Sequence, residues 1–123
     1  MDVVDKWIDI FEKDLGIKCN RSIVYNLYKE GYALELDDKG FALCIAHDDL
    51  LYNKVCSEIM IYLKPEHRNY RNFKKLINFI EEIAKENECT HVQCGAFTGY
   101  SDDKVIKMYR RMGYNTASVR KEL

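Results

Sequence analysis

Apolar residues at the start of the chain recur every three or four positions, which is the spacing of a helix with one buried face. We therefore expect a helix over residues 3–15, ended by Gly16. Asn20 has the side chain of a helix N-cap, and a second amphipathic helix is expected over residues 21–30. The apolar residues concerned are Val4, Trp7, Ile8, Phe11 and Leu15 in the first helix, and Val24, Leu27 and Tyr28 in the second.

The period of the pattern changes to two after Gly31. Apolar and polar residues alternate over residues 32–36, which predicts a strand with one solvated face. Turn residues 37–40 lead into a second strand over residues 41–46, so the two strands form a predicted hairpin. A polar loop follows, and a third strand is expected over residues 58–63, ended by Pro65.

The helical period returns at about residue 71 and continues to about Glu88. Beyond this helix we expect a strand over residues 90–97, a last helix capped by Ser101 or Asp102, and a final strand over residues 114–119. The predicted order is α-α-β-β-β-α-β-α-β, with no internal repeat. We expect residues 1–123 to form a single α/β domain.

Composition agrees with an ordinary globular protein. The 123 residues are 47% apolar and 32% charged, with only one Pro and six Gly. No apolar stretch approaches the roughly 18 residues that a membrane span requires, and no signal-peptide pattern follows Met1. These features favour a cytoplasmic protein.

The five cysteines indicate neither a disulfide framework nor an obvious metal site. Their number is odd and no C-x-x-C pair occurs. The cluster Cys89, His91 and Cys94 comes nearest to a zinc pattern, but on a strand Cys94 would point away from the other two. Reduced and mostly buried thiols are the better interpretation, and no metal is expected.

Charge is distributed unevenly although the formal net charge is only −1. Residues 1–60 carry 7 basic and 12 acidic side chains, whereas residues 61–123 carry 12 basic and 8 acidic ones. A local anion-binding site in the second half would explain this asymmetry. Scatter of charges over a solvated surface is an equally open explanation.

The segment with the clearest chemistry is the turn between Pro65 and the long helix. A turn that runs directly into a helix presents unpaired backbone N–H groups, and the helix dipole adds partial positive charge there. Phosphates bind in such places. The turn is also basic, since it contains Arg68, Arg71, Lys74 and Lys75. Many α/β proteins share a strand, turn and helix of this kind, so this signal is weak by itself.

Two further motifs make the sequence resemble a known family. Residues 58–68 end a strand in Leu-Lys-Pro-Glu-His-Arg, and residues 108–114 read Met-Tyr-Arg-Arg-Met-Gly-Tyr. Both are similar to signatures of the GNAT N-acyltransferases, and the resemblance covers about residues 32–120. It implies a splayed, mixed but mostly antiparallel sheet with helices on both faces, and acetyl-CoA as the co-substrate.

The resemblance also implies roles for particular residues. Tyr109 stands where family members often carry the general acid that protonates the departing thiolate, and Glu58 is the candidate base for the amine. The cofactor-binding positions would be Ile61, Tyr62 and Leu63 through their backbone, together with Arg68, Asn69, Tyr70, Arg71, Asn72, Phe73, Lys74 and Asp102.

Some positions depart from the family pattern. Arg71 and Phe73 stand where the phosphate loop has small residues, and Asp102 replaces the usual Asn. Glycine lets the backbone approach a phosphate closely, which these side chains hinder. Arg71 could instead contact phosphate directly. Compact family members with altered glycine loops resemble proteins of bacteriophages and mobile elements.

We therefore expect an N-acetyltransferase in which an amine attacks acetyl-CoA directly in a ternary complex. The alternative is a catalytically inactive protein of the same fold that binds or inhibits a partner. The aromatic and basic run over residues 70–75 could stack on single-stranded nucleic acid, but Phe73 belongs to the apolar stripe of its helix. Neither the acceptor amine nor the oligomeric state can be read from the sequence.

Overall fold

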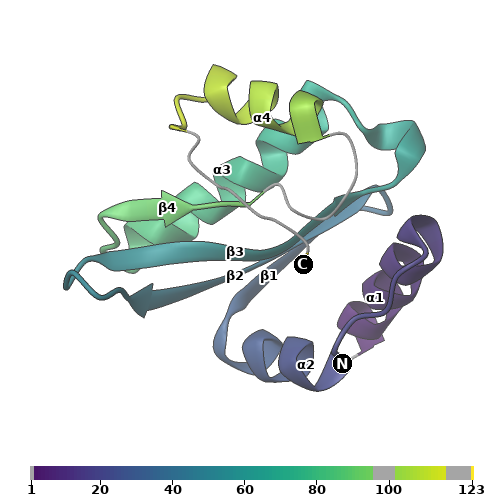
Figure 1. The fold of residues 1–123 in the computed structure, drawn as a ribbon, viewed down its shortest axis with the longest axis horizontal. Coiled ribbons are helices and arrows are strands. Elements are labelled where there is room, and N and C mark those ends of the chain that lie inside the picture. Colours follow the sequence, from purple (N-terminus) through teal and green to yellow (C-terminus); the bar gives the residue numbers. More distant parts are fainter. Residues whose placement is uncertain (1, 96–101, 116–122) are drawn as a thin grey trace.

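The computed structural model describes residues 2–95, 102–115 and 123 (Figure 1). The helices are α1 (Asp2–Leu15), α2 (Arg21–Glu30), α3 (Tyr70–Glu86) and α4 (Asp102–Arg111), with a short 3-10 helix, η1, at Pro65–His67. The strands are β1 (Tyr32–Leu36), β2 (Gly40–Asp48), β3 (Lys54–Leu63) and β4 (His91–Gln93). The expected order of elements is therefore confirmed as far as α4. Most of the expected final strand, residues 114–119, lies outside the described residues.

Two strands are longer than the sequence pattern indicates. β2 continues to Asp48 and β3 begins at Lys54, because these outer residues pair with each other across the hairpin. The loop between the strands is correspondingly shorter than expected. Glu58 consequently lies in the middle of β3, and our expectation that it begins this strand was wrong.

The sheet is mixed and mostly antiparallel, as expected. Its strand order is β1-β2-β3-β4, with antiparallel pairs β1–β2 and β2–β3 and a parallel pair β3–β4. Helices cover both faces: α1 and α2 lie on one side, and α3 and α4 on the other (Figure 1).

The face under α1 is closed by large aromatic side chains. Trp7 of α1 stacks on Phe41 of β2 with ring centroids 6.1 Å apart, and Phe11 meets Tyr62 of β3 edge-on at 5.7 Å. The indole N–H of Trp7 donates to Glu35 at 2.7 Å, so its burial leaves no polar group unpaired.

The opposite face is covered by the amphipathic helix α3. Phe73, Leu76, Ile77 and Ile80 are buried against Ala42 of β2 and its neighbours, which confirms the apolar stripe predicted for this helix. Asn69 caps α3 by accepting a hydrogen bond from the backbone N–H of Asn72 at 2.9 Å. The helix therefore begins at a fixed point directly after the turn.

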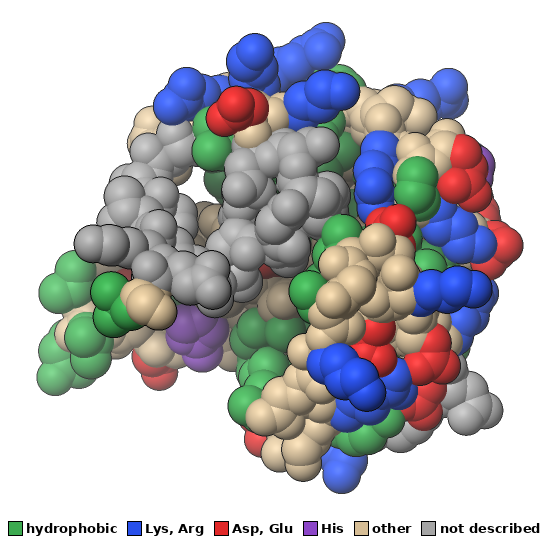
Figure 2. All heavy atoms as spheres, turned by 45° about the vertical axis from the view of Figure 1, so that its right-hand side comes forward, with side chains coloured by type: hydrophobic (Ala, Val, Ile, Leu, Met, Phe, Trp, Pro, Cys, Tyr) green, Lys and Arg blue, Asp and Glu red, His purple; other side chains and the backbone are tan. Residues whose placement is uncertain are grey.

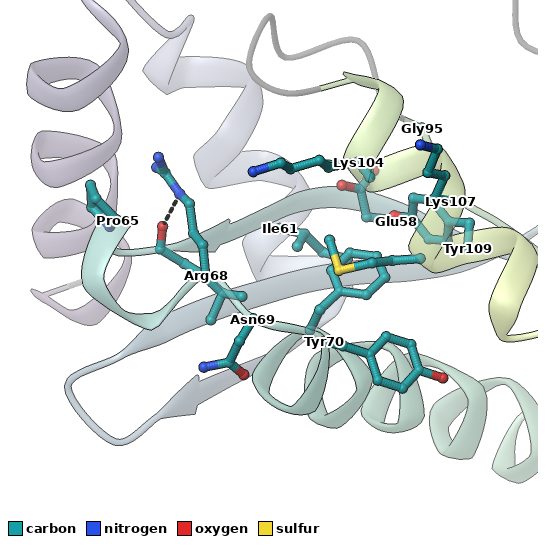
Figure 3. A pocket seen from close by; sticks show the side chains of 14 residues that line it. Glu58, Ile61, Pro65, Arg68, Asn69, Tyr70, Gly95, Lys104, Lys107 and Tyr109 are labelled. Atoms are coloured by element: carbon teal, nitrogen blue, oxygen red, sulfur yellow. Dashed lines mark hydrogen bonds between the residues drawn. The ribbon is translucent and has the colours of Figure 1, made fainter.

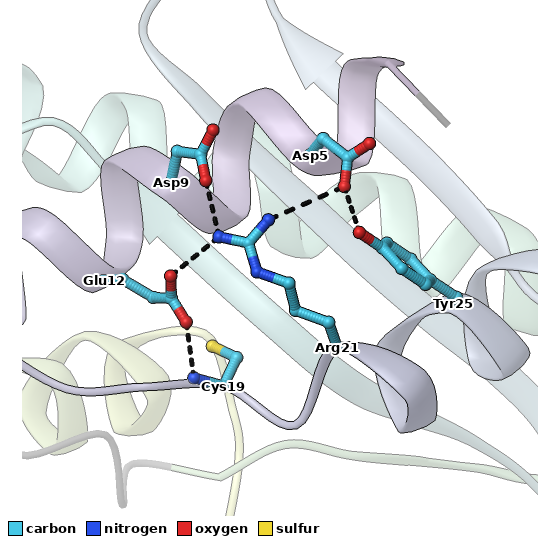
Figure 4. Close-up of polar contacts among 6 residues, drawn as sticks. All are labelled: Asp5, Asp9, Glu12, Cys19, Arg21 and Tyr25. Carbon is cyan, nitrogen blue, oxygen red and sulfur yellow. Dashed lines mark hydrogen bonds and ion pairs between the residues drawn. The ribbon is translucent and has the colours of Figure 1, made fainter.

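Polar contacts help to hold α2 against α1. No residue of α2 is fully buried. The Arg21 guanidinium contacts Asp9 at 2.5 Å, Glu12 at 2.7 Å and Asp5 at 3.7 Å (Figure 4). The Tyr25 hydroxyl donates a hydrogen bond to Asp5 as well. One guanidinium thus joins the two helices through three carboxylates.

The five cysteines are free, with Cys44 and Cys56 fully buried and the other three partly buried. Among the described residues, no group of three or more His, Cys, Asp or Glu could hold a metal ion. In the same part of the chain, no helix is both long and apolar enough to cross a membrane.

Candidate active site

Within the described residues, the parallel strands β3 and β4 pair over three residues. Val55, Cys56 and Ser57 are partnered by residues 91–93, and β3 then continues to Leu63 alongside β2. A cavity of about 530 Å³ lies where α4 and the start of α3 face the C-terminal half of β3 (Figure 3). The fold therefore provides a site between a strand and two helices.

The cavity is lined by Glu58, Ile61, Leu63, Pro65, Arg68, Asn69, Tyr70, Phe73, Gly95, Lys104, Val105, Lys107, Met108 and Tyr109. Both residues to which the resemblance gives catalytic roles, Glu58 and Tyr109, are thus brought together. Most of the expected cofactor-binding positions line the same cavity.

Four expected cofactor-binding side chains do not line the cavity. Arg71 and Lys74 are exposed on α3, whereas Asn72 is buried and donates to the carbonyl oxygen of His67 at 2.9 Å. Tyr62 faces α1, where its hydroxyl donates to Asp14 at 3.0 Å. Asp102 is the first residue of α4, and its side chain lies outside the described part of the chain.

Glu58 is a half-buried carboxyl group on the wall of the cavity. Burial raises its pKa to about 7, although the Gly95 backbone N–H donates a hydrogen bond that favours the charged form. A carboxyl with this pKa is partly ionised at neutral pH and can both take up and release a proton. Glu58 therefore has the property required of a general base.

The raised pKa of Glu58 makes stability depend on pH. Between about pH 4.5 and pH 7 the folded protein binds more protons at Glu58 than the unfolded chain, so the free energy of unfolding falls as pH rises through this window. Glu58→Gln removes this cost and should raise that free energy by roughly 2 kcal/mol at pH 8, with little change near pH 4. Chemical denaturation at both pH values measures the difference. Equal curves for the two proteins at pH 8 would contradict the raised pKa.

Tyr109 presents a protonated phenol to the cavity. The side chain is 4% exposed and its ring meets Phe73 edge-on, with centroids 4.9 Å apart. Burial raises the pKa of its hydroxyl, and the neighbouring Cys94 and Glu58 raise it further. The hydroxyl thus keeps its proton at neutral pH and can donate a hydrogen bond to a group that becomes negatively charged.

Cys94 accepts the hydrogen bond that the Tyr109 hydroxyl donates. Burial raises the pKa of the Cys94 thiol to about 12, so the thiol is protonated at neutral pH. A protonated thiol is a poor nucleophile. Cys94 therefore lacks the ionised form that nucleophilic catalysis by a cysteine requires.

Most backbone N–H groups of the turn before α3 already have acceptors within the protein. His67 donates to Lys64, Arg68 to Pro65, Asn69 to His67, and both Asn72 and Phe73 donate to Asn69. Within the described residues, the N–H groups of Tyr70 and Arg71 have none. These two are the first positions of α3, so the turn offers a ligand two N–H groups and the helix dipole.

The Arg68 guanidinium joins the turn to α1. Its Nη2 contacts Asp14 at 2.5 Å, its Nε donates to the Leu63 carbonyl oxygen at 2.8 Å, and it lies over the Tyr62 ring at 5.4 Å. The sequence analysis did not anticipate Asp14 as its partner. The contact fixes the turn against the opposite layer of the fold.

The cavity also contains two cations that sequence reasoning missed. Lys104 and Lys107 lie on α4, and both side chains are exposed. Part of a signal was present: Lys104 precedes Lys107 by three residues and Met108 by four, and i, i+3 and i+4 positions share a helix face. This spacing groups the three side chains but does not show that their face lines a cavity.

This arrangement of a splayed sheet, a capped helix after a basic turn and a carboxyl–phenol pair defines an acyltransferase-like fold and site. The family model described as "Acetyltransferase (GNAT) family" matches residues 5–114. The chain therefore belongs to the GNAT family of acetyltransferases. No curated protein sequence matches it significantly.

Solved structures with the same fold cover nearly the whole chain. An aminoglycoside acetyltransferase from an uncultured soil sample has a TM-score of 0.75 at 15% identity, covering 99% of this chain and 88% of its own. An aminoglycoside 6'-N-acetyltransferase from Acinetobacter haemolyticus has a TM-score of 0.69 at 20% identity, covering 98% and 90%. A transcriptional regulator from Bacillus halodurans has a TM-score of 0.66 at 14% identity, covering 83% and 73%. At these identities the likeness shows the fold alone.

Proposed function

We propose that this protein transfers an acetyl group from acetyl-CoA to an amine by direct attack in a ternary complex. The observation that carries the proposal is the placement of Glu58 and Tyr109 in one cavity beside the C-terminal half of β3. The two groups have the protonation states that a base and an acid require at neutral pH.

Each residue has a defined part in the proposed reaction. Glu58 takes a proton from the acceptor ammonium, directly or through one water, and the free amine attacks the acetyl carbonyl carbon. The carbon–nitrogen bond forms as the carbon–sulfur bond breaks, and the Tyr109 hydroxyl donates its proton to the departing thiolate. Because a phenol is a weaker acid than a thiol, complete transfer of this proton is uphill, and the hydroxyl acts mainly through the hydrogen bond that it donates as negative charge develops on the sulfur.

The same cavity provides the groups that would hold the co-substrate. Ile61 and Leu63 of β3 line the cavity, and the backbone of residues 61–63 is the part of this strand that would lie along the pantetheine arm. The N–H groups of Tyr70 and Arg71 face the region where phosphates would lie. Arg68, Asn69 and Phe73 shape this end of the cavity.

Acetyl-CoA should stabilise the fold if it binds here. At 100 times its dissociation constant a ligand adds about 2.7 kcal/mol to the free energy of unfolding, which raises Tm by roughly 10 °C for a domain of this size. Differential scanning fluorimetry measures the shift. ATP at the same concentration is the control, because it has the adenosine and phosphates without the pantetheine arm and should give a smaller shift. A flat melting curve with millimolar acetyl-CoA would contradict the proposal.

Turnover separates an enzyme from an inactive relative that only binds. Release of free thiol from acetyl-CoA can be followed with a panel of amines that includes polyamines, peptide amines and an aminoglycoside, the last because similar structures are titled as aminoglycoside acetyltransferases. Binding of acetyl-CoA without turnover of any amine would favour a catalytically inactive GNAT-fold binding protein. The hydrogen bonds within the turn before α3 support this inactive alternative, because they leave fewer N–H groups for phosphate.

A further inference from the structure

The turn before α3 has lost most of its capacity to hold phosphate. Five of its N–H groups bind acceptors within the protein, and two of its basic side chains, Arg71 and Lys74, do not line the cavity. Arg68 does line it, but its guanidinium contacts Asp14 and the Leu63 carbonyl oxygen. A doubly charged pyrophosphate therefore needs cations from another part of the fold.

The opposite wall of the cavity provides such cations. Lys104 extends from α4 across the cavity toward the side on which Arg68 lies, whereas Lys107 projects from the same helix farther away (Figure 3). Within the described residues neither lysine has a carboxylate partner. Lys104 is therefore free to pair with a ligand without breaking an existing ion pair.

The surroundings of Lys104 add to its positive potential. Four of the ten residues of α4 are basic: Lys104, Lys107, Arg110 and Arg111. Lys and Arg side chains gather along the top edge of the molecule in Figure 2, the edge at which α4 lies in Figure 1. Arg111 lies over the ring of Tyr70 at 3.9 Å, so the basic helix is also in contact with the first residue of α3. An anion placed between α4 and the turn would have positive potential on both sides.

We propose that Lys104 is the principal side-chain ligand for the pyrophosphate of the acyl-CoA, with Lys107 strengthening the local field. The inference rests on the proposed function, because it assumes that this cavity takes coenzyme A. In this protein the phosphates are held mainly by an ammonium group on α4 and two N–H groups at the start of α3, and not by a glycine-rich loop. The ammonium is a point charge that tolerates a longer distance from the backbone than close N–H contacts do. Phe73 can then occupy its core position without loss of phosphate binding.

The experiment is a titration of the purified protein with coenzyme A and with dephospho-coenzyme A by isothermal titration calorimetry at about 50 mM salt. Lys104→Met keeps the aliphatic stem and removes the charge, so affinity for both ligands should fall about tenfold. Lys104→Arg should stay within about threefold of wild type. Lys75→Met is the matched control, because Lys75 is an exposed lysine of α3 that does not line the cavity, and it should not change affinity.

Salt provides a second readout that a purely structural role of Lys104 would not alter. Loss of one phosphate contact should make the affinity of Lys104→Met less sensitive to added salt than that of wild type. Equal affinities of Lys104→Met and Lys75→Met for coenzyme A would overturn the inference. A loss seen with coenzyme A but not with dephospho-coenzyme A would overturn it too, because Lys104 would then bind the 3'-phosphate. If wild type itself binds neither ligand, the proposed function fails, which is a different and recognisable result.

Discussion

Tyr109→Phe should lower kcat by about 10²–10⁴-fold while leaving the affinity for acetyl-CoA nearly unchanged. The substitution removes one oxygen and keeps the ring that packs edge-on against Phe73. The lost hydroxyl matters only as the thiolate leaves, so the effect should appear in kcat more than in KM. The free energy of unfolding should change little, because the hydroxyl donates to the Cys94 sulfur, which is a weak acceptor. Steady-state kinetics and chemical denaturation of the two proteins measure these effects.

Tyr114→Phe is the matched control for this experiment. Tyr114 lies next to Tyr109, with ring centroids 5.4 Å apart, but does not line the cavity, and its hydroxyl donates to Glu81 at 2.7 Å. This variant should lose about 1 kcal/mol of stability and keep its activity. The reverse outcome, with Tyr109→Phe active but destabilised, would show that Tyr109 has a structural role only.

Glu58→Gln should reduce kcat/KM by about 10²–10³-fold above pH 7. Wild-type activity depends on ionised Glu58, so it should rise with pH through about pH 7, the pKa that burial gives this carboxyl, and level off above it. The variant cannot accept a proton at this position, so its activity should not show this rise with pH. Initial rates between pH 5.5 and pH 9 at saturating acetyl-CoA test this.

The exposed Glu82 of α3 provides the control, because Glu82→Gln makes the same chemical change outside the cavity and should leave the profile unaltered. If Glu58→Gln kept both the rate and the rise of activity with pH, that rise would reflect deprotonation of the acceptor amine, and Glu58 would not be the base.

The helices and the inner strands could be predicted from the sequence because burial alone determines their patterns. α1 and α3 place large apolar residues on one face, and Asn20 and Asn69 cap their helices by the hydrogen bonds such residues commonly make. The outer parts of β2 and β3 could not be predicted. There, Asp48 and Lys54 are exposed, and Val55 and Cys56 are both buried although they are adjacent, so these residues do not show the alternation of a half-buried strand.

The candidate site was only partly predictable for a similar reason. Glu58 and Tyr109 were found because motif residues surround them. The contact between Asp14 and Arg68 joins residues 54 positions apart, and neither has a local signal for the other. Whether an exposed side chain such as Lys104 lines the cavity depends on how α4 packs against α3. Periodicity within one helix does not determine that packing. Sequence patterns pointed to the proposed acid and base and missed the charges around them.

The contacts between α1 and α2 are of two kinds that respond differently to ionic strength. Attraction between exposed ions weakens as salt screens it, whereas apolar packing does not. The ion pairs of Arg21 with Asp5, Asp9 and Glu12 are therefore sensitive to salt. The partly buried Val24, Tyr25 and Tyr28 pack against the same core cluster as Trp7 and Phe11, and this packing is not screened. Concentrated salt should consequently loosen the start of α2, where Arg21 lies, and leave the rest of the helix packed.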